Sequence, residues 1–321
     1  MSIYDVDGNQ IAESVSSAIS VVGSFGAVGD GTTDDTSAIQ SAVNNKGLLV
    51  FETGKTYRVT STIRIPKNVV IDLNGSTIVS EYKHLFFNFL STDTSFTGYN
   101  GNGNITIKNG TIVGGAISFA HGENIVIDNV QFKNSINDHF LEIAGCKAYS
   151  IRNCSFVGME NLNTSVLEYI NIDPCVYGNF PWVSNGSAFY DNTVNDGIYI
   201  RNCKFSLGSG TYAYGYNAVG VHSTGGVSAK HTNINIVGND IKGFTGCGLR
   251  INMMNGVFID ENNIQTVGNG IVLGDVSDCE NIVIKDNYVV SSNGSKLVKT
   301  NGRYTNLTVV GNKTAGTIED F

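Results

Sequence analysis

One short phrase recurs along the chain and decides the fold: IRNCSF at 151–156, IRNCKF at 200–205, VGNDI at 237–241 and IKDNYV at 284–289. Each copy carries an asparagine beside apolar residues. The recurring asparagines are Asn109, Asn129, Asn153, Asn202, Asn239, Asn262, Asn287 and Asn312. The last three steps, from 239 to 312, measure 23, 25 and 25 residues. A repeat of this length indicates a solenoid in which each repeat is one coil.

Asparagine suits the corner of such a coil. It tolerates the left-handed backbone conformation, and its side-chain amide can hydrogen-bond to the asparagine of the next coil. The composition favours strands and tight turns, with 38 Gly and only 3 Pro among 321 residues. We therefore predict an all-β chain wound into a single-stranded parallel β-helix, with all eight asparagines in one internal ladder.

The beginning of the chain differs from the coils. Residues 1–22 are polar and weakly patterned, so we expect an arm or attachment segment there, followed by a single β-helix domain over 23–321. The run Thr33-Asp34-Asp35 is a helix start, with carboxylates near the positive end of the helix dipole. One apolar face follows it, made of Ala38, Ile39, Ala42 and Val43. We expect a short helix here that covers the open first coil.

The same region resembles a known family. FGAVGDGTTDDTSAIQSAV, residues 25–43, is very similar to the opening signature of the pectate-lyase-like β-helix superfamily. That superfamily includes phage tailspikes, pre-neck appendage proteins and many polysaccharide-cleaving enzymes. The resemblance implies a right-handed β-helix. It does not imply one reaction, because the superfamily contains hydrolases, lyases, epimerases and inactive binding proteins.

Charge and hydropathy exclude several functions. A net charge of −8 argues against nucleic-acid binding, which needs a basic surface. No stretch is long and apolar enough to insert into a membrane. The first residues, MSIYDVDGNQIAESV, have no basic start and no apolar core, so we expect no signal peptide in this chain. By the resemblance, we still expect an extracellular or virion-associated protein.

The six cysteines have neither a disulfide pattern nor the spacing of a zinc site. Cys154 and Cys203 take the same place in two copies of the phrase, so we expect them to be stacked and buried. We expect no metal and no cofactor, except that Ca²⁺ would belong to a lyase of this type.

Two coils are longer than the repeat. The steps from Asn153 to Asn202 and from Asn202 to Asn239 measure 49 and 37 residues, so we expect loop insertions around 158–195 and 206–230. Long loops on a rigid scaffold commonly carry binding and catalysis. The two insertions are rich in aromatic residues, whose rings can stack on the C–H faces of sugars. The expected substrate contacts are Tyr177, Trp182, Tyr190, Tyr214 and Tyr216.

The strand register places further polar residues on one face. We align Leu141-Glu142-Ile143 with Ile170-Asn171-Ile172, Val219-Gly220-Val221, Leu249-Arg250-Ile251 and Ile271-Val272-Leu273. By the two-residue period of strands, the middle residue of each triplet points outward. The residue two positions further along does so too. The predicted outward residues include Glu142, Asn171, Asp173, His222, Arg250 and Asn252.

These residues suggest acid–base chemistry. Glu142 and Asp173 would lie roughly 8 Å apart at the backbone, from a coil step of about 4.8 Å and about 6.6 Å for two residues along a strand. This falls within the range of about 6.5–9.5 Å for inverting glycosidases. His222 would relay protons, and Arg250 would hold the substrate. Asp138, His139 and Glu168 are secondary candidates. We disfavour Glu168, because aligning Leu167-Glu168-Tyr169 with Leu141-Glu142-Ile143 would turn Ile170 and Ile172 to solvent.

Three functions stay open. The first is an endo-acting glycoside hydrolase, a tailspike-like depolymerase with Glu142 and Asp173 as acid and base. The second is a lyase for a uronate-containing glycan, with His222, Arg250 or Lys204 as base or cation and Tyr216 as acid. The third is a glycan-binding adhesin without catalysis. In each case the partner is a polysaccharide or cell-surface glycan, and the resemblance to tailspikes makes a homotrimer an alternative to a monomer.

Overall fold

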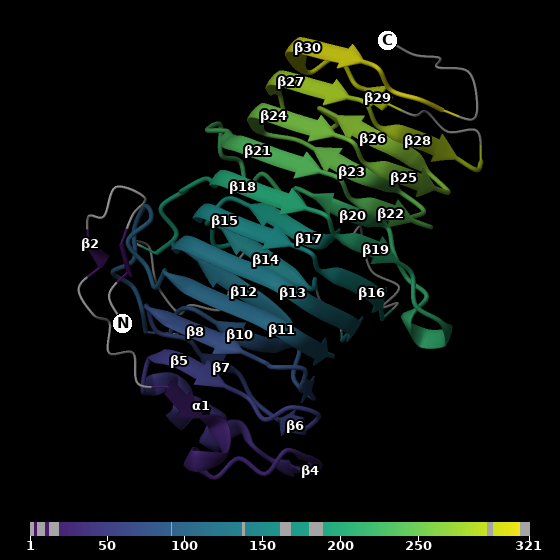
Figure 1. Cartoon of the computed structure of the whole chain (residues 1–321). Coiled ribbons are helices and arrows are strands. Elements are labelled where there is room, and N and C mark those ends of the chain that lie inside the picture. Colours follow the sequence, from purple (N-terminus) through teal and green to yellow (C-terminus); the bar gives the residue numbers. More distant parts are fainter. Residues whose placement is uncertain are drawn as a thin grey trace.

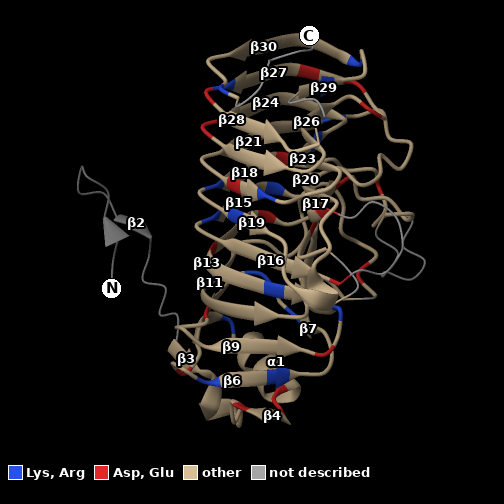
Figure 2. Ribbon diagram, turned by 90° about the vertical axis from the view of Figure 1, so that its right-hand side faces the viewer, with Lys and Arg blue, Asp and Glu red and all other residues tan. Residues whose placement is uncertain are grey.

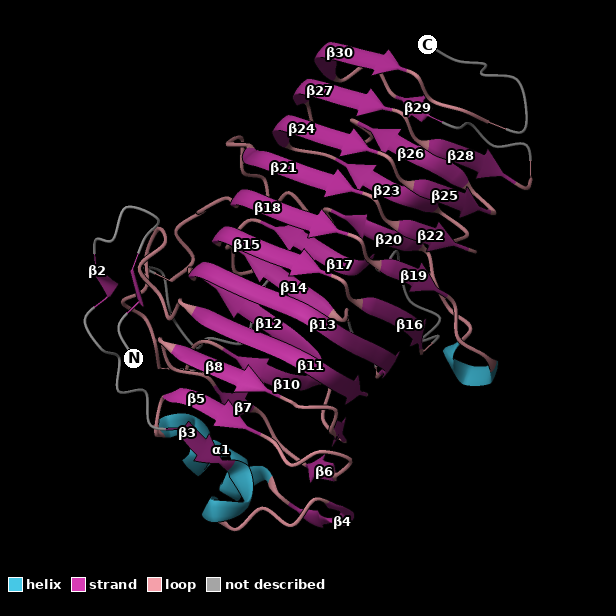
Figure 3. Cartoon of the chain, in the orientation of Figure 1, coloured by secondary structure: helices cyan, strands magenta, loops and turns pink. Residues whose placement is uncertain are grey.

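The computed structural model describes residues 3–4, 10–12, 19–90, 92–136, 139–160, 168–179, 189–293 and 298–314. The chain winds upward in stacked coils, from helix α1 (Thr36–Asn44) at one end to strand β30 (Tyr304–Val310) at the other (Figure 1). Between coils, each strand pairs in parallel with the strand one turn later. The predicted parallel β-helix is therefore confirmed, and among the described residues helices occupy only short segments (Figure 3).

Three stacks of strands form the faces of the column. The first, which carries the candidate site, is a nine-stranded sheet in the described part of the chain. In chain order its members are β7 (Ile63–Arg64), β10 (His84–Phe87), β12 (Ala116–Ala120), β14 (Leu141–Ala144), β17 (Glu168–Asp173), β20 (Asn217–Gly220), β23 (Cys247–Ile251), β26 (Asn269–Leu273) and β29 (Val298–Thr300). We call it the site sheet.

The other two faces share the long strands β11 (Ile105–Val113) and β13 (Glu123–Ser135), which run through both. One stack further contains β3 (Ile19–Val21), β5 (Gly47–Val50), β8 (Val69–Asp72), β15 (Lys147–Arg152), β18 (Asp196–Arg201), β21 (His231–Val237), β24 (Met254–Asp260), β27 (Cys279–Lys285) and β30. The other contains β4 (Asp30–Asp34), β6 (Thr56–Val59), β9 (Thr77–Ser80), β16 (Ser155–Met159), β19 (Lys204–Ser206), β22 (Asp240–Lys242), β25 (Asn263–Thr266) and β28 (Tyr288–Ser291).

The core runs along the axis of the column. Because strands alternate their side chains, each coil directs aliphatic and aromatic residues inward, where they stack on the same residue type one turn away. Phe132, Phe156 and Phe205 form one such stack, with neighbouring ring centroids 4.9 Å apart and nearly parallel. Charged residues make up 15% of the chain, and both signs are spread over the coils (Figure 2).

The predicted capping helix is also confirmed. Helix α1 buries Ile39, Ala42 and Val43 at the end of the column, next to the 3₁₀ turn η1 (Val22–Phe25). Asp34 accepts the Thr36 amide at 3.1 Å. Asp35 accepts the amides of Val28 and Gly29, so the acidic run also orders the preceding loop.

The eight recurring asparagines do not occupy one place, which corrects the prediction of a single ladder. Asn239, Asn262, Asn287 and Asn312 form an inner column, in which each amide oxygen accepts the backbone and side-chain N–H of the preceding asparagine at 2.9 Å. The outer column lies one residue earlier and contains Asn109, Asn129, Asn153 and Asn202, each with φ between 53° and 60°. The paired strands place Cys154 and Cys203 in the inner column, where both are buried. The phrase thus slips by one residue between the two halves of the chain.

Three further observations concern the arm, the helices and the cysteines. Strands β1 (Ile3–Tyr4) and β2 (Gln10–Ala12) form a separate antiparallel pair within the arm, and the attachment role of residues 1–22 stays a prediction. Among the described residues, we find no helix whose length and hydropathy would let it cross a membrane. All six cysteines are buried and free.

Candidate functional site

The site sheet has the register that the sequence predicts. Glu142 pairs with Asn171, Asn171 with Gly220, and Gly220 with Arg250. Ala144 pairs with Asp173 in the next column. The candidate acids, the histidine and the arginine are therefore brought together on neighbouring coils.

Glu168 lies within this group, against the sequence-based preference. Tyr169 and Ile170 both pack in the core, so the two-residue alternation is interrupted between them. On the next coil, the consecutive residues Ala218 and Val219 also both pack in the core. Glu168 consequently lies on the outward face without exposing Ile170 or Ile172.

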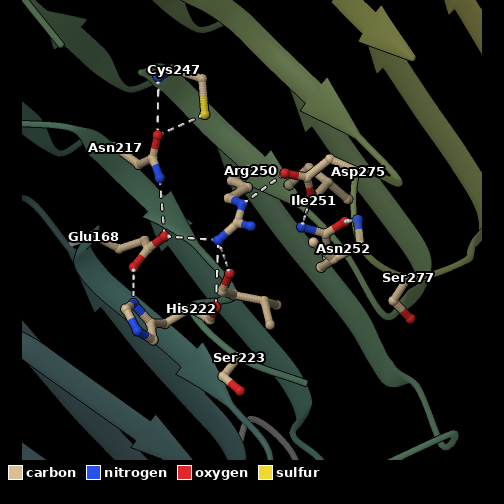
Figure 4. Close-up of polar contacts among 12 residues, drawn as sticks. Glu168, Asn217, His222, Ser223, Cys247, Arg250, Ile251, Asn252, Asp275 and Ser277 are labelled. Atoms are coloured by element: carbon tan, nitrogen blue, oxygen red, sulfur yellow. Dashed lines mark hydrogen bonds and ion pairs between the residues drawn. The ribbon is translucent and has the colours of Figure 1, made fainter. Parts of the chain in front are cut away.

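The Glu168 carboxylate is fully buried and is held by three side chains (Figure 4). Oε1 accepts the Asn217 amide at 3.0 Å and lies 3.5 Å from Nη1 of Arg250. Oε2 lies 3.2 Å from Nδ1 of His222. Burial raises the pKa of Glu168, but the hydrogen bond from His222 and the electrostatic influence of the two neighbouring histidines outweigh it, so the net shift is downward. We conclude that Glu168 is an ionised carboxylate inside the protein.

His222 connects this carboxylate to the surface. Its side chain is 34% exposed, whereas that of Glu168 is not exposed at all. The hydrogen bond to Glu168 raises the pKa of His222, against the smaller opposing effect of burial. The arrangement is a histidine oriented by a carboxylate, which is suited to proton transfer.

Asp173 lies beside His222 on the preceding coil. Its Oδ1 accepts the backbone amides of His222 at 2.9 Å and Ser223 at 3.1 Å. Its Oδ2 is buried and has no hydrogen-bond partner among the described residues. Burial raises the pKa of Asp173 to about 7, with a further contribution from the negative charge of Glu168. Asp173 is therefore an acid that can hold a proton near neutral pH.

Arg250 is engaged inside the protein. Besides Glu168, it contacts Asp275 through Nε at 3.1 Å and donates to the Val221 carbonyl at 3.0 Å. A cavity of about 150 Å³ adjoins it, lined on other sides by Tyr216, Asn269 and Lys299. Arg250 thus braces the neighbouring coils, and its guanidinium is already shared between two carboxylates.

Of the other predicted residues apart from the tyrosines and Lys204, Glu142, Asn171 and Asn252 are buried and two lie outside the described residues. Glu142 is buried and accepts the Ser118 hydroxyl at 2.8 Å. Asn171 and Asn252 are also buried. Asn171 accepts a hydrogen bond from the backbone amide of His222, and the Asn252 side chain donates one to Asp275. Trp182 and Asp138 lie outside the described residues.

The predicted tyrosines differ in exposure. Tyr177 is 65% exposed and meets Tyr190 edge to face, with ring centroids 5.4 Å apart. Tyr216 is exposed at the cavity beside Arg250. Tyr214 instead packs against the core. Lys204 belongs to β19, on a different face of the column from the site sheet, so it does not contribute to this group.

Comparisons with known proteins identify the fold. A model of the family described as rhamnogalacturonase A/epimerase, pectate lyase-like, matches residues 18–166. The plasmin and fibronectin-binding protein A of Streptococcus pneumoniae is 27% identical over 280 residues, which cover 74% of this chain and 38% of that protein. This chain therefore spans well under half of that relative.

Comparison with solved structures also finds proteins of similar fold. The S. pneumoniae surface adhesin PfbA superposes with a TM-score of 0.76 at 23% identity, over 95% of this chain and 82% of that one. A tailspike protein mutant of E. coli bacteriophage HK620, in complex with a pentasaccharide, gives 0.59 at 14% identity, over 97% and 56%. The chain has the pectate-lyase-like right-handed parallel β-helix fold. Likenesses at this identity establish the fold and leave the reaction open.

Within this β-helix, sequence reasoning missed Asn217 and Asp275. Asn217 follows Glu168 in register and also accepts the Cys247 amide at 3.0 Å. Its place could have been found by extending the aligned triplets two residues backward. Asp275 lies beyond β26, in a turn, and no periodicity in the sequence points to it.

Proposed function

We propose that this protein is a polysaccharide-degrading enzyme, an endo-acting glycoside hydrolase of the tailspike-like type. The observation that carries the proposal is the contact between the buried Glu168 carboxylate and the part-exposed His222 imidazole, with the Asp173 carboxyl on the neighbouring coil. Two proton carriers lie next to each other on the outward face of a rigid sheet.

Hydrolysis of a glycosidic bond needs one group that protonates the leaving oxygen and another that activates water. We assign the first role to Asp173, whose buried carboxyl keeps its proton up to about pH 7. We assign the second to Nε2 of His222, since Nδ1 faces Glu168. In this proposal the Glu168–His222 pair replaces Glu142 as the second acid–base group, because Glu142 is buried against Ser118.

The substrate in this proposal is a polysaccharide or cell-surface glycan. Tyr177, Tyr190 and Tyr216 are the described rings that can stack on sugars beside the site. The pentasaccharide bound by a tailspike of the same fold supports such a ligand. An extracellular or virion-associated location belongs to the same proposal, with a homotrimer and a monomer as the two alternatives for its assembly.

The second candidate is a non-catalytic adhesin. One observation favours it: Glu142, Glu168 and Asp173 are all buried, so this structure leaves their carboxyl groups out of the reach of a substrate. The similar structure described as a surface adhesin and the relative described as a plasmin and fibronectin-binding protein support this alternative. A uronate lyase has less support, because Arg250 is already paired with Glu168 and Asp275 instead of facing a substrate carboxylate.

The test is a screen of bacterial surface and plant polysaccharides, read for new reducing ends and for the ultraviolet absorbance of unsaturated uronates. Reducing ends without absorbance, lost in H222N, support the hydrolase. Both signals rising together indicate a lyase. Glycan binding without either signal supports the adhesin and overturns the enzyme.

A further inference from the structure

Two histidines flank the buried carboxylate of Glu168. His139 precedes Leu141 by two residues, as Glu168 precedes Ile170, so the paired triplets place His139 and Glu168 at equivalent positions on adjacent coils. His222 lies on the other side, and the rings of His139 and His222 are 5.7 Å apart. One nitrogen from each histidine and one Glu168 oxygen all lie within 4.8 Å of one another.

These distances approach those of a transition-metal site. In a tetrahedral zinc site, bonds of about 2.0–2.1 Å place neighbouring ligand atoms about 3.3 Å apart. His222 Nδ1 and Glu168 Oε2 are 3.2 Å apart already. The third ligand atom, from His139, lies within 4.8 Å of the other two, which is close enough for a small side-chain movement to complete the set. Two imidazoles and one carboxylate are a common catalytic ligand set for zinc, with the fourth position open.

The surroundings orient these ligands as a metal site requires. His139 directs Nδ1 at the backbone carbonyl of Glu168, 2.5 Å away, so Nε2 is the nitrogen that can bind a metal. Metal-binding histidines usually fix their second nitrogen in this way. Asn217 and Arg250 both contact Oε1 of Glu168, and His222 faces Oε2. The partial exposure of His222 gives an ion a route from solvent.

We propose that His139, Glu168 and His222 bind one divalent transition-metal ion, with Zn²⁺ as the best match. The ion takes Nδ1 of His222 in place of the proton shared with Glu168. A metal-bound imidazole that keeps its proton on Nε2 cannot act as a base. Zn²⁺ therefore inhibits glycan cleavage, a consequence that rests on the hydrolase proposed above, whereas the binding itself does not.

The experiment uses the full chain, stripped with a chelator and titrated with Zn²⁺ by calorimetry and with Co²⁺ by visible absorption. The variants are H139Q and H222N, with H231N as the control that removes a buried histidine outside the group. All of them keep the six cysteines, so thiols cannot explain a difference between variants. Circular dichroism checks that each variant is folded.

We expect one ion per chain in wild type and in H231N, and at least tenfold weaker binding in H139Q and H222N. The Co²⁺ spectrum should show tetrahedral nitrogen and oxygen ligation without a thiolate charge-transfer band. No binding in wild type, unchanged binding in folded H139Q and H222N, or a thiolate band would each overturn the site. If one of these variants fails to fold, the wild-type Co²⁺ spectrum still decides between the site and the cysteines.

The inhibition has a separate readout. Zn²⁺ should suppress reducing-end release on any substrate found, and a chelator should restore it. If Zn²⁺ binds but cleavage continues unchanged, His222 is not the base of the cleavage reaction, and the titrations of H139Q and H222N alone decide the metal site. If the protein cleaves no glycan, the hydrolase fails, and the calorimetry still tests the metal site.

Discussion

The inner asparagine column, from Asn239 to Asn312, and the site around Glu168, His222 and Arg250 place polar groups against the core in different ways. The inner column of asparagines uses neutral amides, which donate and accept hydrogen bonds from coil to coil. The site instead buries carboxylates, whose charges require His222, Arg250 and backbone amides as partners. A satisfied amide adds stability and specificity, whereas buried charges are expensive and seldom add net stability. The contrast indicates that the charges are retained for function.

The largest effect should follow from neutralising the central carboxylate. In E168Q, His222 loses the negative charge that orients it, and Arg250 loses one of its two carboxylates. We expect cleavage to fall roughly 100-fold or more. We also expect a loss of about 3–5 kcal/mol in the free energy of unfolding, because one partner of a buried ion pair is removed. Initial rates and urea unfolding measure the two effects.

The matched control is E142Q, which alters another buried carboxylate of the same sheet. Its Oε2 accepts the neutral Ser118 hydroxyl, a bond that the glutamine oxygen can keep, so both losses should be much smaller than in E168Q. Equal loss of cleavage in the two variants would return the catalytic role to Glu142 and contradict our assignment.

A second prediction breaks the asparagine column. Asn262 is buried, accepts both N–H groups of Asn239, and donates to the Ile236 carbonyl and to Asn287. N262A leaves these groups without partners, at about 1–3 kcal/mol for each one that water cannot reach. We expect a total loss of about 3 kcal/mol or more in chemical unfolding, with cleavage unchanged.

Its neighbour supplies the control. Asn263 is only half-buried, and its side chain donates to Asp240 and accepts from the exposed Gln265. Water can replace these bonds, so N263A should cost less than about 1 kcal/mol. Similar costs at the two positions would mean that the inner column has no special role in stability.

The sequence predicts this fold well because the repeat itself is the structure. The spacing of the phrase gives the coil, and the aliphatic triplets around Glu142 and Arg250 give the register of the site sheet. Two features of the structure were not predicted, and each involves a shift of one residue in the strand pattern. The alternation breaks between Tyr169 and Ile170, which conceals Glu168, and the asparagine moves by one place between Asn202 and Asn239. A two-residue period cannot reveal where two consecutive side chains turn inward, since that depends on the packing of the neighbouring coils.

A third prediction concerns pH and His231, the first residue of β21. This side chain is fully buried, and its Nδ1 accepts the Asn195 amide at 2.9 Å. Burial lowers the pKa of His231 to about 3, from an ordinary value of 6.5. Between these values the unfolded chain binds a proton that the folded chain excludes. Stability should therefore fall as pH falls below about 6.5, by up to about 1.4 kcal/mol per pH unit from this group.

Urea unfolding of wild type and H231N between pH 7.5 and 4.5, in steps of about one unit, isolates this contribution. An asparagine oxygen can replace Nδ1 as the acceptor and does not titrate in this range. The difference in stability between the two proteins should shrink as the pH falls. A constant difference would show that His231 does not keep its neutral form in the folded protein.

The smallest effect should come from the outer column. Asn202 has φ of 54°, and the register gives the equivalent place on the next coil to Gly238, at 68°. Glycine adopts this left-handed conformation without the steric cost that other residues meet. The position therefore requires a residue that tolerates positive φ and no particular side chain. N202G should change the free energy of unfolding by less than about 0.5 kcal/mol, whereas N202A should cost about 1 kcal/mol from left-handed strain. Equilibrium unfolding of both variants beside N262A tests the division into two columns. If N202G costs as much as N262A, the outer asparagines stabilise the coil through their amides, and the distinction between the columns is wrong.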